Sequence, residues 1–205
     1  MPGARDDVLA RVRAALRDVP AGEGAEPPGY EPPPAAAGDP AALFAQRAAD
    51  YRATVREVDD VAAAVARACA EHEARRLGVA PELPETWRPA DVELVADDRD
   101  VSDGDLDALD GALTGCALAI ATTGTIVLDG SGRSGRRALT LIPDLHICVV
   151  ERAQVVADVP DAIRALEGGR GPFTLVSGPS ATSDIELDRV EGVHGPRRLV
   201  ILIAG

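Results

Sequence analysis

Hydroxyl side chains crowd residues 177–186, directly after the apolar run 173–176. The segment opens with the turn Ser177-Gly178-Pro179-Ser180, and Thr182 follows two residues later. Because a Gly-Pro turn leaves backbone N–H groups free, the turn and its hydroxyls together could bind a small anion. We therefore take Ser177, Gly178 and Thr182 as candidate ligand-binding residues.

A histidine between two glycines follows this segment, at His194, and Arg197 lies three residues beyond it. An imidazole in such a place can transfer a proton or bind an anion, and a guanidinium adds charge for the anion. Ser180, Asp184 and His194 have the side-chain types of a hydrolase triad, but no Gly-x-Ser-x-Gly elbow frames the serine. We predict these three as catalytic and Arg197 as ligand-binding; a histidine that only bonds a backbone carbonyl is the alternative.

Two earlier segments could supply further ligands. In the kink 121–125, Gly124 lets the backbone approach a ligand closely, and Thr123 and Thr125 offer hydroxyls. The alternative is a β-bulge whose buried threonines satisfy one another. The segment 130–137 matches Gly-x-Gly-x-x-Gly formally, but it leads into the apolar run 138–142 and not into a helix. We predict a flexible hairpin loop there, in which Arg136 and Arg137 could hold a carboxylate or phosphate.

Composition excludes several classes of function. The 205 residues carry 21 basic and 34 acidic side chains, for a net charge of −13, and every basic residue is an arginine. Without lysine there can be no Schiff base, pyridoxal-phosphate attachment or P-loop. Only 2% of residues are aromatic, so the acidic chain is a poor candidate for binding nucleic acid. Scattered cysteines and histidines predict no disulfide, zinc site or iron–sulfur cluster in this chain: Cys69, Cys116, Cys148, His72, His146 and His194.

The first 40 residues differ from the rest of the chain. Apolar residues at helical spacing predict an amphipathic helix within 1–19, and seven of the 16 prolines fall in 20–40, which predicts an extended linker. We assign the remaining residues, 41–205, to one domain. The start of the sequence lacks a basic, apolar leader, and no apolar run reaches the ~18 residues of a membrane span, so we expect a cytoplasmic protein.

The body alternates helical and strand-like patterns. We predict helices at 43–51, at 61–77 with Asp60 as its cap and Gly78 as its end, and at 159–166. The block 91–110 carries nine acidic residues around a short strand at 92–95; we interpret it as a solvated rim with helix caps, with a metal or basic-partner surface as the alternative. Strands are predicted at 116–121, 125–128, 138–142, 147–150, 173–176 and 199–203. This pattern predicts an α/β layered fold whose loops converge on one pocket at the carboxyl ends of the strands.

Three of these motifs carry a family resemblance: residues 177–186, 192–197 and 139–146, the last reading Leu-Thr-Leu-Ile-Pro-Asp-Leu-His. They resemble the lactate utilization protein C family, also called the LUD domain, from about Gly115 to the end of the chain. The resemblance implies a three-layer α/β/α fold of the NagB/RpiA/CoA transferase-like type, that is, the fold of glucosamine-phosphate deaminases, ribose-phosphate isomerases and coenzyme A transferases. One departure is Thr122, where the family typically has glutamate.

The resemblance also implies a role in oxidising L-lactate to pyruvate, alongside two partner proteins that hold iron–sulfur clusters. Our leading hypothesis is a component of this system that has no cofactor of its own and binds a small carboxylate or other anion. One alternative is a free-standing enzyme, similar to coenzyme A transferases or isomerases, acting on a carboxylate or phosphorylated metabolite. The other is a non-catalytic scaffold.

Overall fold

The computed structural model describes residues 3–18, 38–98, 100–168, 171–179, 181–182, 190–191 and 195–205. The chain divides into two compact units, residues 1–33 and 34–205. The first contains helix α1 (Ala4–Ala15), which has no buried residue. None of the helices in the described ranges is long and apolar enough to span a membrane.

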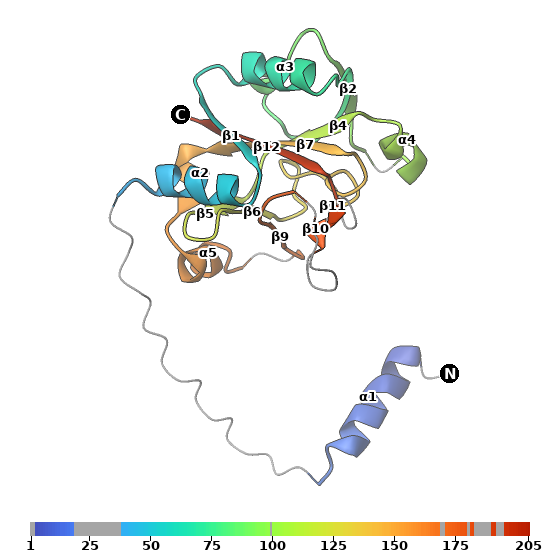
Figure 1. Cartoon of the computed structure of the whole chain (residues 1–205). Helices are drawn as coiled ribbons and strands as arrows, with labels where there is room; N and C mark the ends of the chain where they lie inside the picture. The colour runs from blue at the N-terminus through green and yellow to red at the C-terminus, as the bar shows by residue number, and fades with distance from the viewer. Residues whose placement is uncertain are drawn as a thin grey trace. The chain divides into compact units, whose positions relative to one another are not determined.

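A parallel sheet of six strands forms the centre of the second unit (Figure 1). Its order is β1-β12-β7-β4-β2-β3. The strands span, in chain order, Thr54–Val58, Arg76–Val79, Glu93–Ala96, Gly111–Thr114, Leu145–Glu151 and Arg198–Ala204. The two longest, β7 and β12, pair along their whole length from Leu145 opposite Arg198 to Glu151 opposite Ala204. Both are buried on both faces, which explains their continuous apolar sequences.

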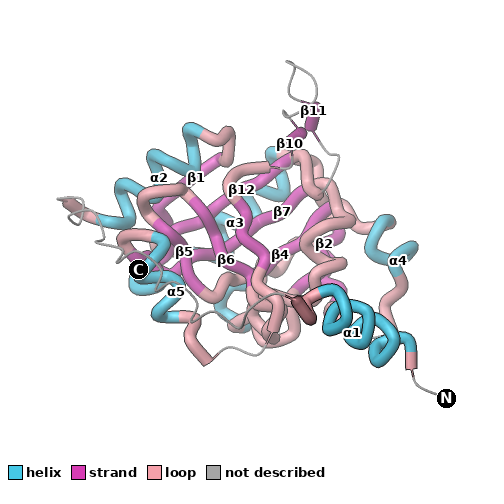
Figure 2. The backbone as a smooth tube through the Cα atoms, turned by 90° about the horizontal axis from the view of Figure 1, so that it is seen from below, coloured by secondary structure: helices cyan, strands magenta, loops and turns pink. Residues whose placement is uncertain are grey.

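Layers on both faces cover this sheet. Helix α3 (Val61–Glu71) packs on one face, where side chains such as Ile147 and Val149 meet it. The other face meets helix α2 (Pro40–Asp50) and a second sheet of order β8-β5-β6-β9. Those strands span Val155–Val156, Leu118–Ile120, Thr125–Leu128 and Thr174–Val176. Helix α5 (Val159–Ala165) lies on the far side of the second sheet, beside β5 (Figures 1 and 2). A central parallel sheet flanked by helices confirms the predicted α/β class.

Short elements complete the unit. They are the 3₁₀ turns Glu85–Trp87 and Arg152–Gln154, helix α4 (Asp103–Asp107), and the antiparallel pair β10 (Ala181–Thr182) and β11 (Val190–Glu191). Side-chain caps define where helices begin, because an oxygen at the cap accepts from an N–H that the helix itself cannot pair. Asp60 accepts from the backbone N of Ala63 at 3.0 Å, as predicted, and Ser102 forms a capping box with Asp105 on α4.

The predicted helix 61–77 is wrong in its second half. Helix α3 ends at Glu71, Glu73 has a φ of +57°, and strand β2 begins at Arg76. Gly78 therefore lies within a strand and ends no helix. A Cβ on Gly78 would lie 2.5 Å from Leu139 Cδ1, so close packing between β2 and this leucine requires the glycine. The strands β1 and β4 were not predicted. The predicted strand 116–121 is present as β5, which spans only Leu118–Ile120.

The predicted strand 138–142 is also wrong. These residues form turns in which the backbone N–H groups of Leu141 and Ile142 both donate to the carbonyl of Ala138. Leu139 is fully buried, so the apolar run reflects burial of a turn and not a strand. Consequently the glycine-rich segment 130–137 is not a hairpin loop between two strands.

Candidate functional site

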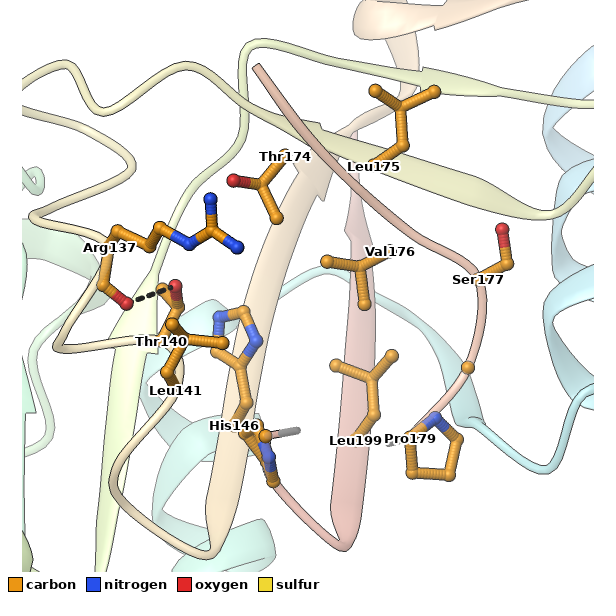
Figure 3. A pocket seen from close by; sticks show the side chains of 13 residues that line it. Arg137, Thr140, Leu141, His146, Thr174, Leu175, Val176, Ser177, Pro179 and Leu199 are labelled. Atoms are coloured by element: carbon orange, nitrogen blue, oxygen red, sulfur yellow. Dashed lines mark hydrogen bonds between the residues drawn. The ribbon is translucent and has the colours of Figure 1, made fainter. Parts of the chain in front are cut away.

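A cavity of about 280 Å³ lies beside strand β9, near the amino ends of β7 and β12 (Figure 3). The sequence predicts a site at the carboxyl ends of strands. This cavity is lined by the segment that follows the carboxyl end of β9, but it lies near the amino ends of the two central strands, where His146 and Leu199 are each the second residue. The described residues that line the cavity come from four segments: Arg137, Thr140, Leu141, His146, Thr174, Leu175, Val176, Ser177, Gly178, Pro179, Gly195, Pro196 and Leu199.

Arg137 brings positive charge to this cavity. Its side chain is exposed, points toward Thr174 in Figure 3, and has no hydrogen-bond or ion-pair partner within the described ranges. The hydroxyl of Thr140 donates to the backbone carbonyl of Arg137 at 3.2 Å and so fixes the start of its side chain. An unpaired guanidinium beside hydroxyl groups is suited to a carboxylate or phosphate.

The neighbouring Arg136 is fully engaged elsewhere. Its Nη2 lies 2.6 Å from Oδ1 of Asp97, and its backbone N donates to Oδ2 of the same residue at 2.9 Å. The Asp97 side chain is fully buried, and its hydrogen bond raises the pKa of Arg136. Of this adjacent pair, Arg137 alone has no partner among the described residues and so can bind a ligand.

His146 supplies a buried imidazole to the same cavity. It is 2% exposed, and its Nε2 lies 2.8 Å from Oγ1 of Thr114 on the adjacent strand β4. Burial lowers the pKa of His146 to about 4, so the ring is uncharged at neutral pH. The other ring nitrogen, Nδ1, has no hydrogen-bond partner in the part of the chain that the structure describes. Figure 3 shows the ring beside Thr140.

A chain of three hydroxyls joins two of the predicted loops. Thr123 Oγ1 lies 2.7 Å from Thr125 Oγ1, which lies 2.7 Å from Ser177 Oγ. Leu175 and Ser177 point away from the side of β9 on which Thr174 and Val176 face the cavity (Figure 3). The Ser177 hydroxyl is thus bonded to Thr125 and not aimed at His146. This arrangement fits the alternative in which the threonines satisfy one another.

The two glycines of these loops pack against helix α2. At Gly124 the φ is +60°, and a Cβ there would lie 2.4 Å from the backbone N of Ala48. At Gly178 the φ is +84°, and a Cβ would lie 2.4 Å from the carbonyl O of Tyr51. Each glycine thus allows its loop to approach the helix backbone, and the close contact predicted from sequence is made with α2.

The remaining predicted site residues fall into two groups. Arg197 does not line the cavity; its Nε donates to Oδ1 of Asp144 at 2.5 Å, and this bond raises the pKa of Arg197. Ser180, Asp184 and His194 lie outside the described residues, as does the side chain of Thr182. The predicted catalytic set therefore stays a prediction.

The acidic block 91–110 serves local structure in the part that the structure describes. Asp97 pairs with Arg136, Asp105 caps α4, and Asp110 accepts from the backbone N–H groups of Arg75 and Arg76. Within the described ranges, no group of three or more His, Cys, Asp or Glu side chains could hold a metal ion. These contacts agree with the interpretation of the block as a rim with caps.

Comparison with known proteins decides the family. The family model of the LUD domain matches residues 42–204. The chain belongs to the LUD domain family. It is 44% identical over 185 residues to lactate utilization protein C of Deinococcus radiodurans, covering 87% of this chain and 86% of that protein. It is also 38% identical over 91 residues to lactate utilization protein C of Bacillus pumilus, covering 41% of this chain and 38% of that protein.

A solved structure shares the fold. The crystal structure of a DUF162 family protein from Deinococcus radiodurans superposes with a TM-score of 0.70 at 36% identity, covering 81% of this chain and 96% of that one. The family resemblance predicted from the motifs is thereby confirmed. Kinship to coenzyme A transferases within this fold class stays a prediction. Thr122, the departure from the expected LUD pattern, is exposed at the tip between β5 and β6.

Sequence reasoning missed the central polar groups of this LUD-domain cavity. His146 entered only as the last residue of a resemblance motif and as one of three histidines that predict no zinc site. Thr140 and Thr174 were not predicted as site residues. A signal was present, since His146 is the one polar residue in the run 145–150. A histidine within a strand covered on both faces must be buried, and a buried imidazole requires hydrogen-bond partners.

Proposed function

We propose that this chain is a component of an L-lactate utilization system and that the cavity at Arg137 binds a small carboxylate. The kinship to proteins named lactate utilization protein C supports the system. The guanidinium of Arg137, which has no partner in the described ranges, lines a cavity of about 280 Å³ and carries the proposal for the site. That volume is at the lower end of the range for ligand pockets, so it favours a metabolite of few atoms over a nucleotide or coenzyme.

The electrons from lactate would pass to partner proteins that hold iron–sulfur clusters. Clusters are usually held by four cysteine thiolates, and this sequence has three cysteines. All three thiols are buried, and the pKa of Cys116 is raised by its hydrogen bond to Cys148 and by burial. Buried thiols are poor ligands and poor nucleophiles, which supports assigning the redox chemistry to other chains.

The experiment compares two exposed arginines. Arg137→Ala removes the cavity charge, and Arg67→Ala removes an equal charge from helix α3, on the opposite face of the central sheet. We expect L-lactate binding by calorimetry to weaken at least tenfold in the first variant and to stay unchanged in the second. A strain carrying only the Arg137→Ala chain should then grow poorly on L-lactate. Equal binding by both variants would contradict the carboxylate site.

The scaffold hypothesis has its own support, because the hydroxyls of the 121–125 loop and of Ser177 bond to one another and the loop glycines pack on α2. It predicts a different growth result. Loss of the whole chain would prevent growth on L-lactate, whereas both arginine variants would restore it fully. A free-standing enzyme would instead convert its acid or sugar phosphate without any partner, a result that a spectroscopic assay of the purified chain would detect.

A further inference from the structure

We propose that His146 makes the cavity selective for 2-hydroxy carboxylates, by hydrogen bonding the hydroxyl on the carbon next to the carboxylate that Arg137 binds. This inference rests on the proposed carboxylate site. It assigns separate tasks to two side chains of the cavity: Arg137 neutralises charge, and His146 recognises an uncharged oxygen.

The first support is the free ring nitrogen. Nδ1 of His146 has no hydrogen-bond partner among the described residues. Because His146 is buried but lines the cavity, the ring can be reached by a ligand only from there.

The second support is the way in which the ring is held. Nε2 is fixed by Thr114 at 2.8 Å, and strand β7 fixes the backbone on both sides of the residue. If Nε2–H donates to Thr114, Nδ1 is an acceptor; if Thr114 donates, Nδ1–H is a donor. A ligand hydroxyl can donate or accept, so it pairs with either tautomer.

The third support is the placement of the two groups. Arg137 and His146 lie on either side of Thr140, whose hydroxyl fixes the Arg137 backbone (Figure 3). Both side chains line the same cavity of about 280 Å³, so one small acid can contact both of them. Burial lowers the pKa of His146 to about 4, so the ring does not compete for the carboxylate as a second cation at neutral pH.

An acid without the hydroxyl would displace water from Nδ1 and leave it unpaired. An unpaired buried polar atom weakens binding by roughly one to two orders of magnitude, and sites built around a hydroxyl reject analogues that lack it. We therefore expect the full-length chain to bind L-lactate about 10- to 100-fold more tightly than propionate. Calorimetry at pH 7 measures both constants and requires no variant.

Variants connect this preference to His146. His146→Phe should bind both acids with similar affinity, near that of propionate for the original chain. His146→Gln keeps a hydrogen-bonding group and should restore part of the preference, with Arg67→Ala as the control that leaves it unchanged. Thermal unfolding of each variant reports whether it folds. If a variant does not fold, the relative affinity of the original chain for L-lactate and propionate still tests the inference.

The outcomes separate this inference from the proposed function. Binding of neither acid would overturn the carboxylate site and this inference with it. Equal binding of L-lactate and propionate by the original chain would overturn the role of His146 alone. If His146→Phe still bound L-lactate more tightly than propionate, the role of His146 would also be overturned.

Discussion

The carboxyl ends of the strands in the six-stranded sheet and the cavity near the amino ends of β7 and β12 use charge in opposite ways. At the carboxyl ends, arginines are held in ion pairs: Arg133 with Glu151 at 3.1 Å, Arg136 with Asp97 at 2.6 Å, and Arg152 with both Asp39 and Glu57 at 2.6 Å. In the cavity, Arg137 and Nδ1 of His146 lack partners within the described ranges.

This difference separates polar groups that are paired within the fold from polar groups that could bind a ligand. Ligands of open α/β sheets usually bind beyond the carboxyl ends of the strands, yet here paired charges occupy that edge. Arg133 is further engaged by the ring of Trp87, whose centroid lies 4.9 Å from its guanidinium carbon. Of two adjacent arginines, Arg136 belongs to the ion-paired carboxyl ends and Arg137 belongs to the cavity. We therefore base the proposed site on the availability of hydrogen-bonding groups and not on position along the sheet alone.

The largest effect on stability is expected at Asp97. Asp97→Ala removes a buried carboxylate and leaves the guanidinium and backbone N–H of Arg136 without their acceptor. Breaking a buried pair in this way costs about 3 kcal/mol, at the lower end of the usual range because Arg136 is 34% exposed. Urea unfolding measures the loss, and Asp97→Asn, which keeps an acceptor, should lose less. A loss below about 1 kcal/mol in Asp97→Ala would show that the carboxyl-end pairs are not structural.

The cavity should instead respond to pH through His146. In the unfolded chain this histidine takes up a proton below its ordinary pKa of 6.5, whereas burial holds the folded pKa at about 4. The unfolded state therefore binds more protons between these values, and the free energy of unfolding falls as pH drops from 6.5 to 4. The full difference is on the order of 3 kcal/mol.

The measurement compares the original chain with His146→Phe in urea at pH 7 and pH 4.5. The variant has no imidazole to titrate, so its stability should fall less over this interval. Parallel losses in the two proteins would mean that His146 is not buried in an uncharged form. That result would remove the contrast between an uncharged cavity ring and the ion-paired edge.

Sequence patterns predicted the fold class because the strands that build the core are apolar at consecutive positions. The runs 147–150 and 199–203 became β7 and β12, and Asp60 became the cap of α3. Strand β1 was missed because it has exposed and half-buried positions at the sheet edge. The run 138–142 was wrongly predicted as a strand, because its apolar residues reflect burial of a turn and not pairing in a sheet.

The site was predictable only in part. Arg137 could be identified because a basic pair follows a glycine-rich turn, but the sequence does not tell which member pairs with Asp97, 39 residues earlier. Thr125 and Ser177 were predicted to converge and do lie 2.7 Å apart, yet their hydroxyls bond to each other. Side-chain direction on a strand depends on its register with neighbouring strands, which a single sequence does not reveal.

A smaller effect is expected where a motif glycine packs on α2. Gly124→Ala should destabilise the chain by about 2 kcal/mol, because the new Cβ would meet the backbone of α2 at 2.4 Å in addition to the strain at φ +60°. Gly130→Ala is the matched control, since its φ is +68° but nothing lies within 4 Å of its Cβ position. It should cost about 1 kcal/mol. Equal losses in urea unfolding would mean that the contact with α2 can relax, and the glycine would again be free for a role at the ligand.

The smallest effect on stability is expected at Arg137, which is the sharpest test of the comparison. Its guanidinium has no partner among the described residues, so Arg137→Ala removes no ion pair and should change the free energy of unfolding by less than about 0.5 kcal/mol. Arg136→Ala, one residue away, should cost about 2 kcal/mol because it leaves the buried Asp97 carboxylate unpaired. Urea unfolding of the two variants side by side measures the contrast. If Arg137→Ala were as destabilising as Arg136→Ala, Arg137 would belong with the structural arginines of the carboxyl ends, and its weakened lactate binding would no longer report a contact with the ligand.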